Sequence, residues 1–196
     1  MTQRASGPAD RPESWPVHAS EDVWRGKTPF AVRRDTISSP QEPDEQFDRL
    51  VVEHPGAAVV LAVDNEDRAL VLEQYRHPIG MRLVELPAGL LDASHEDPLE
   101  AARRELREEA MFEADTWSHL LSVYTSPGVV GERLEIFLAQ DLSATEDRGD
   151  FVPAHEEADM TVSWVPVREL LDGVLAGELT DGPLALAVLA YTARGS

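Results

Sequence analysis

The chain contains no cysteine, few cationic residues and no long apolar run. Each of these absences excludes a class of protein. Without cysteine there is no disulfide, no thiolate metal site and no cysteine nucleophile. Lys and Arg total 17 against 37 Asp and Glu, a formal charge of −20, so the chain repels phosphate backbones and anionic lipid. The apolar runs are too short to span a bilayer, and the N-terminus lacks the apolar core of a signal peptide. We therefore expect a cytoplasmic protein that binds neither nucleic acid nor membrane.

The length of 196 residues allows one ordinary domain with a small accessory element. Residues 1–16 mix Pro, Gly, Ser and charged side chains without apolar periodicity, which is typical of a disordered lead-in. Residues 17–47 contain short β-branched and aromatic patches, which predict a small N-terminal β-sheet. The polar, proline-containing stretch 39–45 indicates a break near the end of this sheet, and we expect residues 48–196 to form the main domain.

In the main domain, β-patterned and helical stretches are intermixed. Strands are expected at 51–54, 57–63, 69–75, 120–124, 135–142 and 161–165. Helices are expected at 98–111, 166–175 and 181–192. Because no regular βαβ repeat is present, we expect an α/β fold of the mixed α+β kind, in which helices flank a mixed sheet.

The helix expected at 98–111 carries a cluster of carboxylates. Glu105, Glu108 and Glu109 are three and four residues apart, so their side chains share one side of the helix. Such oxygen ligands suit Mg²⁺ or Mn²⁺. Taken alone, the helix is better explained by a solvated, salt-bridged surface than by a metal site, since Arg104 is spaced to pair with Glu108. The preceding loop favours the metal site.

Loop and helix together resemble the signature of the Nudix hydrolases, in which a glycine and a glutamate precede Arg-Glu and Glu-Glu pairs at fixed spacing. The positions that match are Gly89, Glu96, Arg104, Glu105, Leu106, Glu108, Glu109 and Phe112. There are two departures: Gly89 and Glu96 are separated by six residues rather than five, and Met111 stands where the signature has a glycine. An extra loop residue is well tolerated. If Met111 ends the helix with a positive φ, it costs roughly 1 kcal/mol.

The resemblance implies an α/β/α sandwich with a mixed sheet, and a small N-terminal antiparallel sheet that exchanges between the subunits of a homodimer. It also implies Mg²⁺ or Mn²⁺ as cofactor and hydrolysis of a nucleoside diphosphate derivative. Arg104 would orient a glutamate, and Glu96 would support either the groups around the metal ligands or an outer metal. The remaining metal ligands carried over by position are the carbonyl of Ala88 and the side chains of Glu105, Glu108 and Glu109.

Further positions resemble the members that hydrolyse ADP-ribose. Pro127 and Gly128 match a marker proline after the signature, although an ordinary Pro-Gly turn explains them as well. The other candidates are Glu132 near the terminal ribose or metals, Arg76 for phosphate, Trp24 and Arg25 for adenine, and Glu156 or Glu157 as the general base. An acidic solvated loop is the alternative for either base candidate. For Trp24, burial at a dimer interface is the favoured alternative.

We therefore expect ADP-ribose to be split into AMP and ribose 5-phosphate. A GDP-hexose, a flavin or a dinucleotide are rival substrates. A Nudix-like non-catalytic nucleotide-binding or regulatory domain is the alternative function, and Met111 is its best support. The complete set of helix glutamates argues for an enzyme.

Overall fold

The computed structural model describes residues 7–91, 96–149, 151–152 and 158–195. The chain divides into two compact units, Met1–Glu53 and His54–Ser196, which we call the N-terminal and the C-terminal unit. Over the described residues, no helix combines the length and the apolar character needed to cross a membrane.

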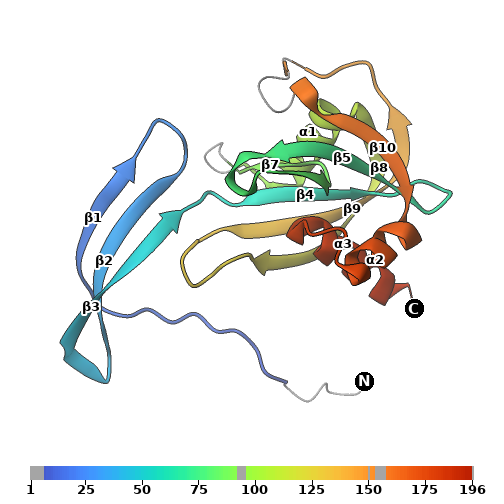
Figure 1. Cartoon of the computed structure of the whole chain (residues 1–196). Helices are drawn as coiled ribbons and strands as arrows, with labels where there is room; N and C mark the ends of the chain where they lie inside the picture. Colours follow the sequence, from blue (N-terminus) through green and yellow to red (C-terminus); the bar gives the residue numbers. More distant parts are fainter. Residues whose placement is uncertain (1–6, 92–95, 150, 153–157, 196) are drawn as a thin grey trace. The chain divides into compact units, whose positions relative to one another are not determined.

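The N-terminal unit is an antiparallel sheet in the order β1-β2-β3 (Figure 1). Its strands are β1 (Val17–Arg25), β2 (Ala31–Ser39) and β3 (Glu42–Glu53). The break expected at 39–45 is instead a hairpin turn, because Ser39 pairs with Glu42 and β3 starts there. Pro43 lies within β3, an edge strand, where a missing N–H is tolerated. Residues 51–53, expected in a strand of the main domain, are the end of β3.

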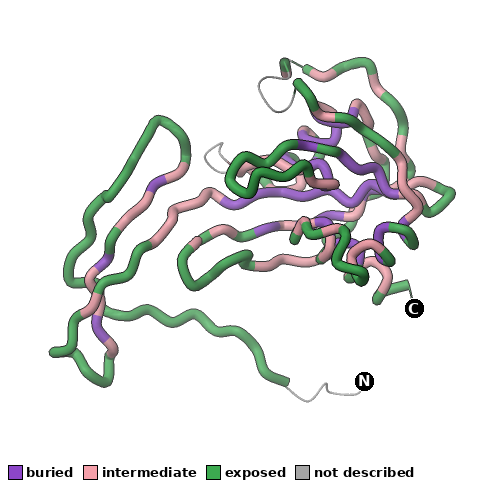
Figure 2. Tube along the Cα trace, viewed as in Figure 1, coloured by how far each residue is buried: buried purple, intermediate pink, exposed green. Residues whose placement is uncertain are grey.

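Much of this sheet is in contact with solvent (Figure 2). Every residue of β1 is exposed, and β2 alone contains buried residues, among them Ala31 and Asp35. The exposed large apolar side chains of the sheet are Val17, Val23, Trp24 and Leu50. Such an element gains little stability from burial within one chain.

The C-terminal unit contains a mixed sheet in the order β7-β4-β9-β8 and a second, antiparallel sheet in the order β10-β5-β6 (Figure 1). Strands β4 and β9 are parallel, whereas the β4–β7 and β8–β9 pairs are antiparallel. The strands are β4 (Ala57–Ala62), β5 (Arg68–Arg76), β6 (Met81–Glu85), β7 (Ala88–Leu90), β8 (Phe112–Tyr124), β9 (Arg133–Ala144) and β10 (Thr161–Pro166), with a 3₁₀ turn η1 at His77–Ile79. The expected mixed sheet is therefore confirmed.

Helices cover both faces of this sheet, and β4 shows the two faces most clearly. All residues of β4 are buried. Its alternate side chains enter two separate apolar clusters: Val59 and Leu61 pack with α2 (Val167–Ala176) and α3 (Gly182–Arg194), while Ala58 and Val60 pack with α1 (Pro98–Ala110). A strand buried on both faces becomes continuously apolar, as the sequence of β4 is. The α/β/α layering is confirmed.

Local signals define the ends of α1. Asp97 accepts a hydrogen bond from the Leu99 N–H at 2.8 Å, and Pro98 occupies the first turn. At the other end Met111 has φ 58° and ψ 40°, the left-handed conformation. Helix and cap therefore follow the sequence expectation, including the positive φ at a residue that is not glycine.

Candidate metal and substrate site

The signature residues meet where α1 packs beside β7. The core-facing side of α1 is formed by Ala101, Ala102, Leu106 and Ala110. Glu105 and Glu109 are also buried, with exposed fractions of 7% and 8%. Buried carboxylates are rare in proteins unless cations or hydrogen bonds compensate them, so this side of α1 is unlike an ordinary solvated helix face.

Gly89 makes room for the carboxylate of Glu105. A Cβ atom built on Gly89 would lie 1.7 Å from Oε1 and 2.1 Å from Cδ of Glu105. Any side chain at position 89 would therefore displace the Glu105 carboxylate, which is the movable partner. The glycine that opens the signature is explained by this close approach rather than by an unusual backbone angle.

Glu109 joins α1 to the backbone of β7. Its Oε2 atom accepts a hydrogen bond from the backbone N–H of Ala88 at 3.0 Å. Strand β7 is itself held to β4, since Ala88 pairs with Val59. The residue expected to offer its carbonyl to a metal is thus fixed in place by one of the expected metal-binding glutamates.

Arg104 lies among three carboxylates. Its Nη1 donates to Glu105 Oε1 at 2.5 Å and to Glu108 Oε2 at 3.1 Å, and its Nε donates to Glu96 Oε1 at 3.3 Å. The sequence brings these four residues together as expected, and the pairing of Arg104 with Glu108 is confirmed.

One guanidinium does not compensate this group. Burial raises the pKa of Glu105 to about 6, even though the charge and hydrogen bond of Arg104 act to lower it. For Arg104, burial lowers the pKa, but its carboxylate partners raise it more, so the arginine stays protonated. Glu96 Oε2 is buried and has no hydrogen-bond partner among the described residues. The cluster retains excess negative charge.

A divalent cation fits this donor set. Within the described ranges, no group of three acidic or histidine side chains is already arranged to hold a metal ion, and the Arg104 guanidinium lies between the carboxylates. However, carboxylate oxygens are the ligands that Mg²⁺ and Mn²⁺ prefer. Among the described residues Glu96 Oε2 has no hydrogen-bond partner, and Gly89 leaves room for the carboxylate of Glu105, so both observations indicate a site arranged around carboxylate oxygens.

Arg76, the expected phosphate ligand, ends β5 and pairs with Glu85 of β6. Its Nε and Nη2 donate to the two oxygens of Glu85 at 2.8 and 2.6 Å. This bond raises the pKa of Arg76, and the charges of Glu109 and Asp181 raise it further. About half of the Arg76 side chain, 47%, remains exposed. Glu85 therefore orients the guanidinium of Arg76, and the exposed part of the side chain can contact a ligand.

Glu85 and Asp181 belong to this neighbourhood, although sequence reasoning gave neither a role there. Asp181 caps α3 by accepting from the Leu184 N–H at 2.8 Å. Burial, then the nearby charge of Glu85, raises its pKa to about 6, while Arg76 acts to lower it. Asp181 was expected only as a helix start, and Glu85 lies in β6, a strand that was not expected at all.

Glu132 belongs to a separate set of contacts. It accepts a hydrogen bond from Thr125 at 2.7 Å and lies 3.3 Å from Nε2 of His54. Pro127 and Gly128 lie in the turn before it, where the N–H groups of Val129 and Val130 donate to the carbonyl of Ser126. These contacts fix the loop between β8 and β9.

The remaining candidates belong to the N-terminal unit or lie outside the described residues. Trp24 and Arg25 belong to the N-terminal unit, where Trp24 is 52% exposed. Arg25 pairs there with Asp22 and Glu53, each at 2.7 Å. Glu156 and Glu157, the candidate bases, lie outside the described residues.

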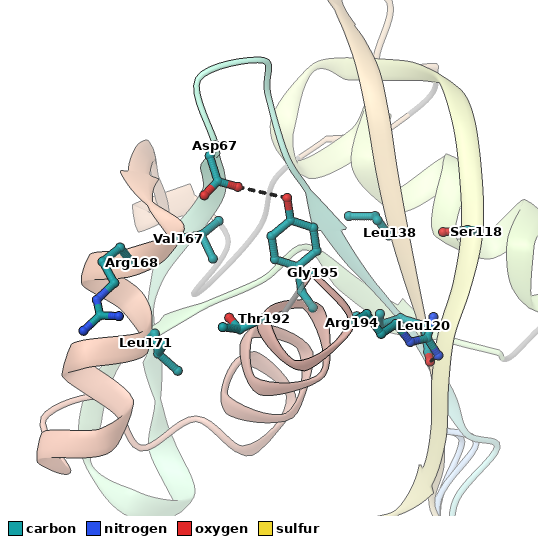
Figure 3. Close-up of a pocket in the computed structure, with 11 residues that line it drawn as sticks. Asp67, Ser118, Leu120, Leu138, Val167, Arg168, Leu171, Thr192, Arg194 and Gly195 are labelled. Atoms are coloured by element: carbon teal, nitrogen blue, oxygen red, sulfur yellow. Dashed lines mark hydrogen bonds between the residues drawn. The ribbon is translucent and has the colours of Figure 1, made fainter.

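A cavity of about 530 Å³ lies elsewhere, between α2, α3 and β8 (Figure 3). It contains none of the signature carboxylates. Tyr191, which lines it, donates to Asp67 at 2.9 Å. Its two arginines have partners: Arg168 pairs with Asp172 at 3.0 Å, and Arg194 donates to the carbonyls of His119 and Leu120. We assign no function to this cavity.

Comparison with known proteins agrees with this geometry. The family model of the NUDIX domain matches residues 52–184. An ADP-ribose pyrophosphatase from Mycobacterium tuberculosis is 42% identical over 164 residues, which cover 84% of this chain and 77% of that protein. An ADP-ribose pyrophosphatase from Bacillus subtilis is 36% identical over 71% of this chain and 74% of its own. The chain belongs to the Nudix family.

A solved structure shows the same fold. The crystal structure of an ADP compounds hydrolase superposes with a TM-score of 0.74, covering 95% of this chain and 98% of its own, at 20% sequence identity. At that identity the likeness concerns the architecture alone.

Proposed function

We propose that this protein is a divalent-metal-dependent pyrophosphohydrolase that splits ADP-ribose into AMP and ribose 5-phosphate. The observation that carries the proposal is the buried carboxylate group of α1, whose negative charge one arginine does not compensate. Family membership and two ADP-ribose pyrophosphatase relatives favour this substrate over other nucleoside diphosphates.

The reaction joins the oxygen of a water molecule to one phosphorus of the diphosphate. The bond from that phosphorus to the bridging oxygen breaks, and the bridging oxygen leaves with the other phosphate. The proton of the water passes to a general base, for which Glu156 and Glu157 are our candidates. When bound, Mg²⁺ or Mn²⁺ neutralises the diphosphate and lowers the pKa of the attacking water.

The metal would be held by Glu105, Glu108, Glu109 and the carbonyl of Ala88, with Glu96 at its outer side. Arg104 acts as a positioning residue, because it touches Glu96, Glu105 and Glu108 and thereby sets the direction of their oxygens.

Arg76 would bind a phosphate oxygen. Glu85 orients the guanidinium by two parallel hydrogen bonds, which limits the rotation that a free arginine would lose on binding. We propose that Glu132 contacts the terminal ribose of the substrate. Pro127 and Gly128, in the loop before it, would also contact the substrate. Trp24 and Arg25 are our candidates for the adenine.

The N-terminal sheet would complete a homodimer through residues 21–50. The exposed Val23, Trp24 and Leu50 support this proposal, since such apolar side chains on a three-stranded sheet gain burial from a second copy. Light scattering gives the test: twice the chain mass at micromolar concentration is expected, and a monomer would contradict the proposal.

The substrate proposal is tested by product analysis. The protein is incubated with ADP-ribose in Mg²⁺, in Mn²⁺ and in a chelator, and the products are separated by chromatography. We expect AMP and ribose 5-phosphate with either metal and neither product in the chelator. A GDP-hexose arm tests the main rival substrate. Absence of AMP with both metals would contradict the proposal, and GMP release at a higher kcat/KM would change the substrate.

A further inference from the structure

A second cavity, of about 370 Å³, lies between α1 and the first half of β8, and Arg104 belongs both to its lining and to the candidate metal site. It is lined by Glu100, Arg103, Arg104 and Arg107 from α1 and by Glu113, Ala114 and Trp117 from β8. Three of the 17 cationic residues in a chain of net charge −20 therefore line one small cavity. Such a local reversal of charge indicates an anionic ligand.

The arginines of this cavity differ in how they are compensated. Arg103 pairs with Glu100 at 2.6 Å, and Arg104 faces the glutamates of the candidate metal site. Arg107 has no carboxylate within ion-pair distance in the part of the chain that the structure describes, and its Nε is buried without a hydrogen-bond partner there. Gly149 lies beside it, since a Cβ built there would be 3.6 Å from Arg107 Nη2.

A second guanidinium on that neighbouring loop shares this property. Nε of Arg148, the residue before Gly149, is also buried and has no hydrogen-bond partner among the described residues. Buried donors are nearly always satisfied in folded proteins. The described residues supply no acceptor for these two N–H donors, which lie in adjoining segments. An anion with several oxygen atoms would supply such acceptors.

Trp117 adds an aromatic wall. Its Nε1–H donates to the carbonyl of Ala114 at 2.9 Å, which fixes the plane of the indole ring. The Arg103 guanidinium carbon lies 5.9 Å from the ring centroid. A rigid indole next to arginine is a surface on which an aromatic base can stack while the guanidinium meets a phosphate.

We propose that this cavity binds a phosphate monoester that carries an aromatic base, the chemistry of a nucleoside monophosphate. The phosphate contacts Arg107 and Arg103, and the base lies on Trp117. The volume falls within the range of small-molecule sites. In the 530 Å³ cavity of Figure 3 both arginines have partners, and neither shows the buried Nε without a hydrogen-bond partner that Arg107 has among the described residues.

Nuclear magnetic resonance of the full chain in a chelator tests the proposal without turnover. The indole N–H signal of Trp117 is identified by its loss in Trp117→Phe. The protein is then titrated with AMP, with ribose 5-phosphate and with inorganic phosphate. We expect AMP to shift this signal to saturation, and the two ligands without a base to bind more weakly and to shift it less.

Arg107→Ala should weaken AMP binding measured at Trp117 by about tenfold or more, the scale of a lost charge-assisted contact. Arg107→Gln, which keeps the length of the side chain, is the second variant if the first does not fold. Arg168→Ala is the matched control, because Arg168 is a helical arginine that lines the other cavity. It should bind AMP as the parent does.

Two results would overturn the proposal: a Trp117 signal that AMP leaves unmoved, or equal AMP affinity in the parent and both Arg107 variants. Phosphate or ribose 5-phosphate binding as tightly as AMP would overturn the assignment of a base. These outcomes are independent of ADP-ribose hydrolysis, since the titration is made in a chelator and measures binding at Trp117 rather than turnover.

Discussion

Arginine and carboxylate side chains meet both in the N-terminal sheet and at α1, but the carboxylate pKa values shift in opposite directions, because burial outweighs the arginine at Glu105. In the sheet, hydrogen bonds from Arg25 lower the pKa values of Asp22 and Glu53, and hydrogen bonds from Arg33 lower that of Asp35. At α1, burial raises the pKa of Glu105 to about 6 in spite of Arg104.

The difference comes from the ratio of charges and from access to water. In the sheet two arginines serve three carboxylates, of which Asp22 and Glu53 remain partly exposed and Asp35 is buried. At α1 one arginine serves three carboxylates that are largely buried. Ion pairs in the sheet are complete as they stand, whereas the carboxylates of α1 require another cation. A cluster of carboxylates whose negative charge is not compensated indicates a metal site, whereas the number of charged residues alone does not distinguish such a site from a charged protein surface.

Glu109→Gln is the strongest test of this contrast. The amide oxygen can still accept the Ala88 N–H, so the fold should survive, while one charge and one metal ligand are lost. We expect turnover to fall by orders of magnitude, because transition-state charge is no longer compensated. Turnover and thermal midpoint are measured with and without Mg²⁺. Retained activity with an unaltered metal-induced stabilisation would show that α1 is only a charged helix.

Gly89→Ala tests whether the position of one carboxylate matters. The new methyl group would displace the Glu105 carboxylate by more than an ångström, since the two would otherwise overlap. We expect kcat/KM to fall about a hundredfold, the scale of misplacing a catalytic group by about 1 Å. The free energy of unfolding should change little, because Glu105 can move and the backbone at Gly89 suits alanine. Gly182→Ala, where a Cβ meets no neighbour, is the matched control.

Asp181→Asn extends the comparison to a buried carboxylate outside the cluster. Burial raises the pKa of Asp181 from 3.8 to about 6, so the folded state holds the proton more tightly than the unfolded state. The resulting stability is fully present below pH 3.8 and is lost as the pH rises through 6. Urea unfolding should show Asp181→Asn to be more stable than the parent by about 2 kcal/mol at pH 8 and by little near pH 4, since asparagine also caps helices. Parallel pH profiles would contradict this.

Met111→Gly addresses the end of the same helix. The left-handed φ of 58° strains a residue with a Cβ, and glycine removes that strain. We expect the free energy of unfolding to rise by about 1 kcal/mol in urea titrations. Turnover should stay within twofold of the parent, roughly the spread of an unperturbed site. A loss of stability would mean that packing of the methionine side chain outweighs the backbone term.

Asp22→Asn is expected to have the smallest effect. The carboxylate is at the surface and pairs with Arg25, which keeps Glu53 as a second partner. Exposed pairs contribute little to folding, so thermal midpoint and turnover should both match the parent. A clear drop in the thermal midpoint or in turnover would show that the ion pairs of the sheet matter as much as those of α1.

The sequence predicts the layers of the C-terminal unit well because the buried elements have strong patterns. Strand β4 is apolar throughout, and α1 repeats apolar residues at helical spacing after Pro98. The short strands β6 and β7 were not predicted. Their residues are too few for a period to appear, and pairing with β5 and β4 stabilises them. Strand β8 starts at Phe112, earlier than predicted, because its first half is polar and pairs with β9.

The candidate site divides in the same way. Contacts within one helix and its loop, such as that of Arg104 with Glu108, could be predicted from the spacing in the sequence alone. The pairing of Arg76 with Glu85 depends on the β5–β6 hairpin, and the approach of Asp181 depends on where α3 packs. Contacts set by tertiary structure leave no period in the sequence, and one amino-acid chain cannot reveal them by pattern.

Met111 has a consequence for how α1 opens. Its N–H donates to the carbonyl of Arg107, and its carbonyl accepts from Thr145 just after β9, so hydrogen bonds on both sides hold a strained backbone in place. If the end of β9 detaches, the strain is released together with the last turn of α1. Amide hydrogen exchange should therefore find that turn less protected than the first, and in step with Thr145. Glu108 and Glu109 lie on the more easily opened turn, so a ligand that binds them would also slow its exchange.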